Sequence, residues 1–107
     1  MSSTPVQEHL AHARFHAGES PTGIGAAVIS SAIDGDDHAW ECVVTDGREW
    51  HYVRVLGTGL GPFPNLSPEV VEEGIQRFAA TLPAQDRIRH LLNANPLHID
   101  REGNVSD

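Results

Sequence analysis

The fold of this chain is decided by the stretch AWECVVTDGREWHYVRVL, which runs from Ala39 to Leu56. Two runs rich in β-branched and aromatic residues flank Asp46-Gly47, a dipeptide typical of the tight turn of a β-hairpin. We therefore expect two antiparallel strands here, and we expect the other elements to pack on this hairpin or to extend it.

The turn leaves two strand registers open. A two-residue turn pairs Thr45 with Arg48 and puts Trp50 and Tyr52 on the face opposite the large apolar residues of the first strand. A three-residue loop with a left-handed glycine bulge pairs Val44 with Arg48 and moves both aromatics to that apolar face. We favour the second register, because it gathers the large apolar side chains on one face that the core can bury.

Periodic patterns flank the hairpin on both sides. Residues 1–18 read as a helix with Thr4 as N-cap, and residues 24–33 read as a strand rich in Ile and Val. Ser67–Leu82 has the features of a capped helix, since Ser67 precedes Pro68 and apolar residues recur at helical spacing. Residues 84–93 predict a second helix, and residues 97–99 a short extended segment.

These elements predict an α+β fold. We expect a three-stranded antiparallel meander, with the N-terminal helix and the two C-terminal helices packed on one face of the sheet. Residues 1–99 are expected to form a single domain, and residues 100–107 to form a polar, disordered tail.

The charge of the chain disfavours several classes of partner. The net charge is −8, with 15 acidic residues against seven basic ones. Nucleic-acid binding and anionic membrane surfaces both require a basic surface, so neither is expected as a partner. No apolar run is long enough to span a bilayer, and no signal peptide is evident. The single cysteine, Cys42, fits a reduced, cytoplasmic setting.

The order of features from about Trp40 to Ile99 resembles a group of small uncharacterised bacterial proteins. In that group a hairpin leads through a loop to a helix that starts with Ser-Pro-Glu, and a Pro and an Ile/Leu/Arg-rich segment follow. The matching stretches here are WECVVTDGREWHYVRV and SPEVVEEGIQRFAATLPAQDRIRHLL. The chain departs from the pattern before Pro83, where AATLP replaces an acidic run. The resemblance supports the fold and implies no function.

Three histidines form the most suggestive candidate site. His9, His12 and His16 lie at i, i+3 and i+7, within a sector of about 60° on a helix. Imidazoles on one face can bind Zn²⁺ or Ni²⁺, but the first and third lie two turns apart and do not easily reach one ion. A zinc site normally adds a distant ligand to a pair one turn apart. The candidates for that ligand are His98, His51 and Glu8. The simpler interpretation is a polar flank of the helix.

The hairpin contributes two further candidates. In the two-residue register Cys42 and His51 are cross-strand neighbours, as a thiolate nucleophile requires, although a core cysteine explains Cys42 more simply. In the same register an exposed face suited to binding a partner carries aromatic and arginine side chains. These are Arg48, Trp50, Tyr52 and Arg54.

The sequence therefore favours a small non-enzymatic interaction or regulatory module, whose partner is another protein or a second copy of the chain. The alternative is a metal- or small-ligand-binding protein that uses the N-terminal histidine face. No cofactor is expected under the first hypothesis, and Zn²⁺ or Ni²⁺ is expected under the second.

Overall fold

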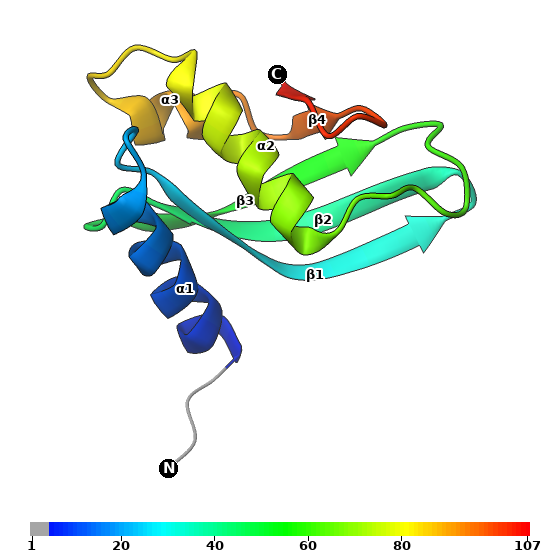
Figure 1. Cartoon of the computed structure of the whole chain (residues 1–107), viewed down its shortest axis with the longest axis horizontal. Coiled ribbons are helices and arrows are strands. Elements are labelled where there is room, and N and C mark those ends of the chain that lie inside the picture. Colours follow the sequence, from blue (N-terminus) through cyan, green and yellow to red (C-terminus); the bar gives the residue numbers. More distant parts are fainter. Residues whose placement is uncertain (1–4) are drawn as a thin grey trace.

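The structure is a computed structural model that describes residues 5–107. Three helices and one five-stranded sheet make up this part of the chain (Figure 1). In chain order they are α1 (Pro5–Glu19), β1 (Gly25–Asp34), β2 (Asp37–Thr45), β3 (Trp50–Gly57), α2 (Pro68–Ala80), α3 (Arg87–Asn93), β4 (Leu97–Ile99) and β5 (Val105–Ser106). No helix of the described residues is long and apolar enough to cross a membrane. The predicted cap Thr4 lies outside the described residues.

The α+β class is confirmed, but the predicted three-stranded antiparallel meander is only part of a larger, five-stranded mixed sheet. The meander β1-β2-β3 continues into β4 and β5, which makes a mixed sheet because β4 runs parallel to β3. A parallel pair needs a long crossover connection, and α2 with α3 supplies it. The two added strands have three and two residues, too few to show a strand pattern in the sequence.

Residues 100–107 also differ from the expected disordered tail. The Asp100 carboxylate accepts backbone hydrogen bonds from Glu102 and Asn104, which folds the segment back so that β5 pairs with β4. Arg77 of α2 donates to the Gly103 carbonyl oxygen at 2.9 Å. A turn that its own aspartate stabilises and a long-range hydrogen bond thus order a polar sequence.

The hairpin uses neither of the predicted turns. Thr45 pairs with Trp50 across a four-residue loop, in which Asp46 accepts the backbone N–H groups of Arg48 and Glu49. This pairing distributes the side chains over the two faces as the two-residue turn does. The favoured register was therefore wrong, and Trp50 and Tyr52 lie on the face opposite the main core.

The three helices do not share one face of the sheet. The main core lies under α2 and α3, which pack on Ala26, Cys42 and Val44 among others. Helix α1 packs with Leu10 and Ala13 on Ala27 and Val43, and these alternate with the main-core residues along β1 and β2. Alternating strand residues point to opposite faces, so α1 covers the other face, which we call the outer face.

Helix α2 matches its prediction and organises the core. Ser67 is the N-cap, and its side chain accepts the Val70 N–H. Val71, Ile75 and Phe78 are buried against the sheet. The helix also contacts β5, so it spans the sheet from its first strand to its last.

Replacement of Gly25 by Ala should release α1 from the outer face. A Cβ at Gly25 would overlap the Ala13 carbonyl oxygen in the α1 backbone, which cannot move aside without shifting the helix. Overpacking of this kind costs about 1–3 kcal/mol or more, and urea unfolding measures it. The control is Gly18→Ala in α1, where an added Cβ meets no atom within 4 Å. This substitution is expected to stabilise the fold slightly, because Ala favours the helix more than Gly does. Equal stability of the two variants would contradict the packing of α1.

Candidate metal centre

Glu72 is a buried carboxylate at the edge of the sheet. It projects from α2 with only 7% of its surface exposed, and it is the only acidic residue that is buried in the described part of the chain. Its Oε2 accepts the backbone N–H of Val28 at 2.9 Å. Val28 lies at a β-bulge, where the pairing with β2 skips Ile29. Glu72 therefore satisfies a backbone donor of the edge strand β1.

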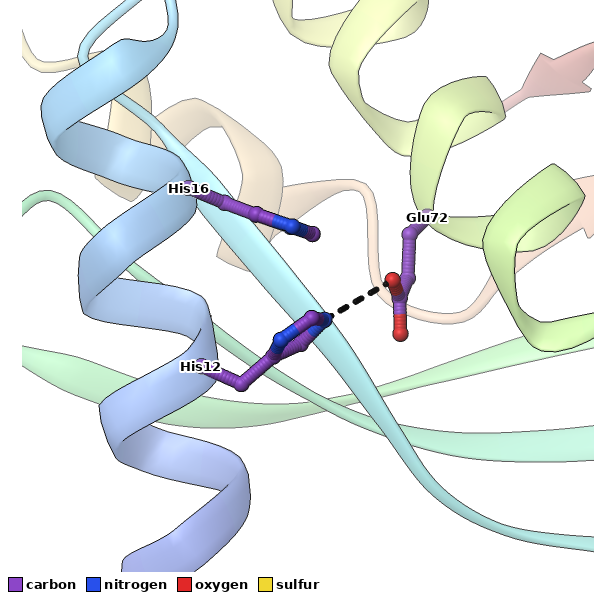
Figure 2. A group of neighbouring side chains, drawn as sticks. All are labelled: His12, His16 and Glu72. Atoms are coloured by element: carbon purple, nitrogen blue, oxygen red, sulfur yellow. Dashed lines mark hydrogen bonds and ion pairs between the residues drawn. The ribbon is translucent and has the colours of Figure 1, made fainter.

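Two histidines of α1 reach Glu72 around that edge. Figure 2 shows His12 and His16 projecting from α1 toward Glu72, with β1 passing between the two helices. His12 Nε2 lies 3.2 Å from Glu72 Oε1, and the imidazoles of His12 and His16 have their centroids 4.0 Å apart. The i, i+4 spacing places the two rings side by side on one flank of the helix, with their planes tilted by 57°.

These three side chains form a group that can hold a metal ion. One ligand atom from each of His12, His16 and Glu72 lies within 4.8 Å of the others, and no second such group occurs among residues 5–107. Of the predicted face, His12 and His16 are brought together, whereas His9 is not part of the group. None of the predicted distant ligands supplies the third position. The third member of the group is Glu72. In the sequence it is recognisable only as a charged residue beside the apolar stripe of α2.

The donor set suits a transition metal. Two imidazole nitrogens and one carboxylate oxygen are ligands of Zn²⁺, Ni²⁺ and Fe²⁺, and a set of three leaves coordination positions open. Zinc ligands at ~2.0–2.2 Å from the ion lie about 3.5 Å from one another. The carboxylate is fixed by Val28, whereas His12 is exposed and His16 half-buried, which leaves the two imidazoles room to rotate toward a common point.

A cleft of about 440 Å³ opens beside the group. Three more carboxylates line it, those of Glu19, Glu69 and Glu73. Gln76 lies one turn after Glu72 and accepts a hydrogen bond from the Ser20 hydroxyl at 2.8 Å. This bond joins two residues that line the cleft. The carboxylates give the cleft a negative potential, which attracts cations and repels anionic molecules.

The predicted hairpin site is only partly assembled. Trp50 and Tyr52 are 37% and 49% exposed on the outer face, with their rings edge to face at 5.4 Å. Arg54 follows on the same face and pairs with Glu41 at 3.3 Å. Arg48 lies in the loop instead and lines a different cleft.

Cys42 is not placed to act as a nucleophile. It is fully buried and pairs with Val53, while His51 pairs with Val44. Burial raises the pKa of the Cys42 thiol to about 12, with a further contribution from the negative charges of Glu72 and Glu41. The thiol therefore stays protonated near neutral pH, which fits a core residue.

Comparison with known proteins adds no relative. No family model, curated protein or solved structure matches this chain.

Native Cys42 should react extremely slowly with iodoacetamide. The thiolate is the reactive form, and a rise of the pKa from 9.0 to about 12 lowers its fraction about 1,000-fold near neutral pH. Mass spectrometry after labelling at pH 8 should show an unmodified native chain, and complete labelling in denaturant serves as the control. Labelling of the native protein at the rate of a free thiol would show that Cys42 is accessible.

Proposed function

We propose that this protein binds a divalent transition-metal ion, Zn²⁺ or Ni²⁺, through His12, His16 and Glu72. The observation that carries the proposal is the buried Glu72 carboxylate, which faces two imidazoles instead of an arginine. A buried charge requires a compensating charge. A metal ion held by all three side chains supplies one.

The hydrogen bond from Val28 supports this role for Glu72. Metal-binding carboxylates are commonly oriented by an outer hydrogen bond, and loss of such a partner costs about 10–100-fold in affinity. Here Oε2 is occupied by the backbone, which leaves Oε1 directed at His12. The carboxylate is thus held in position by the fold.

The surrounding charges favour uptake of the ion over chemistry on an anionic substrate. The cleft carries Glu19, Glu69 and Glu73 beside the ligands. These carboxylates raise the local concentration of cations. A binding or buffering protein, with ion exchange through the open cleft, fits this surface. A cytoplasmic location belongs to the same proposal, since the lone cysteine suits a reducing compartment.

Metal titration by calorimetry tests the site. We expect one Zn²⁺ or Ni²⁺ per chain, and a loss of more than about 100-fold in affinity for His12→Ala, His16→Ala and Glu72→Gln, since each removes a ligand. Zinc at 100 times its Kd should also stabilise the fold by about 2.7 kcal/mol, in a chelator-reversible thermal shift.

The matched control is His9→Ala, which removes a histidine from the same helix but outside the group. It should bind metal as the wild type does. Binding that survives Glu72→Gln but is lost in His9→Ala would refute the proposed ligand set.

A second candidate function is self-association through the outer face of β3. Helix α1 packs on β1 and β2, whereas Trp50 and Tyr52 on β3 stay exposed as an edge-to-face pair. Exposed aromatic side chains beside arginine are enriched at protein interfaces. A second copy of the chain can present the same patch across a two-fold axis.

Light scattering coupled to size exclusion tests this surface. The wild type should be a dimer, and Trp50→Ala with Tyr52→Ala should shift it to a monomer. Phe63→Ala is the control, because Phe63 is an exposed aromatic on a different segment and should leave the dimer intact. A monomeric wild type at high protein concentration would exclude the interface.

A further inference from the structure

A second cleft lies between the hairpin loop and α3, and it shares no residue with the metal centre. Its volume is about 710 Å³. Its larger apolar side chains are Ile24 and Ile88, which are buried, and Leu92, which is half-buried. Most of the remaining lining is polar or charged, so the cleft offers a small apolar surface beside several charged groups.

The cleft gathers arginine side chains in an acidic protein, opposite three carboxylates that also line it, those of Asp46, Glu49 and Asp86. Of the seven basic residues of the chain, Arg48, Arg87 and Arg89 line this one cleft. Each of these carboxylates has a partner within the rim. Asp46 accepts two backbone N–H groups of its own loop, Asp86 lies 4.0 Å from Arg89, and Glu49 lies 4.0 Å from His51. Among the described residues, Arg87 has no carboxylate within ion-pair distance, whereas Arg48 lies close enough to Asp46 to lower the pKa of that carboxyl.

Arg87 is held in place without being neutralised. Its two terminal nitrogens donate to the carbonyl oxygens of Thr22 and Leu82, each at 3.1 Å. Neither acceptor carries a charge, and no carboxylate of the described residues lies within ion-pair distance of the guanidinium. Arg87 Nε is also the one buried side-chain nitrogen or oxygen in residues 5–107 that lacks a hydrogen-bond partner. A guanidinium that neutral acceptors hold in place and no carboxylate balances is suited to bind an anion through its remaining terminal N–H groups.

We propose that this cleft binds a small organic acid. The carboxylate pairs with Arg87, Arg48 adds a second positive charge at the mouth, and the apolar body of the acid packs on Ile24, Ile88 and Leu92. The apolar lining favours an organic carboxylate over inorganic phosphate, because phosphate would leave that surface unused. The proposal is independent of metal binding, since it uses none of the metal ligands.

Nuclear magnetic resonance titration of the full ¹⁵N-labelled chain tests the proposal, with phenylacetate as the probe. Saturable shifts should map to the amides of Gly23, Glu49 and Ile88. The neutral analogue 2-phenylethanol and inorganic phosphate should each bind at least about tenfold more weakly, since one lacks the charge and the other the apolar body. Equal binding of either compound, or shifts that map elsewhere, would overturn the assignment.

Three variants separate the role of the arginines from a general effect on the fold. Arg87→Gln should weaken phenylacetate binding about tenfold or more, and Arg48→Ala by a few-fold, as expected for loss of a charged hydrogen bond and of a nearby charge. Arg14→Ala removes an exposed arginine of α1 that lies outside the cleft and should bind as the wild type does. Arg48 lies in an exposed loop, so its variant decides the question even if Arg87→Gln proves unstable. Unchanged affinity in Arg48→Ala and in a folded Arg87→Gln would refute the proposal.

Discussion

The structure depends on one buried carboxylate at the edge of the sheet. Glu72 takes up the N–H of Val28 where the bulge interrupts β1, and so satisfies a donor that the edge strand leaves outside the ladder. A buried negative charge is unfavourable unless positive or hydrogen-bonding groups surround it. His12 places an imidazole nitrogen 3.2 Å from its other oxygen, from the opposite face of the sheet. The carboxylate therefore joins three elements, namely α1, β1 and α2.

Helix α2 places the candidate site because it connects both ends of the sheet. Glu72 and Gln76, on successive turns, bond to β1, to the segment before it and to α1. On another flank, Arg77 bonds to the Gly103 carbonyl next to β5. Because an apolar stripe fixes the helix on the core, these polar groups are held in register. The geometry of the metal ligands is thus a consequence of core packing.

Local patterns in the sequence predicted the α+β class, the hairpin strands, the capped helix α2 and the histidine flank of α1. What they missed arises from long-range contacts. The register depended on the Asp46 loop, whose side-chain hydrogen bonds form a four-residue connection instead of the expected two or three. Helix α1 has small buried residues such as Ala13, and a weak stripe of this kind does not show which sheet face it covers. Glu72 escaped notice because an acid in the first turns of a helix is ordinarily explained by the helix dipole.

The central claim is that His12, His16 and Glu72 bind one metal ion around the edge of β1. Diffraction from crystals grown with one equivalent of zinc, collected on both sides of the zinc absorption edge, tests it most directly. The account predicts a single anomalous peak at ~2.0–2.2 Å from one nitrogen of each histidine and from Glu72 Oε1. A peak at another position, such as beside His9, or no peak with the His12–Glu72 hydrogen bond intact, would contradict it.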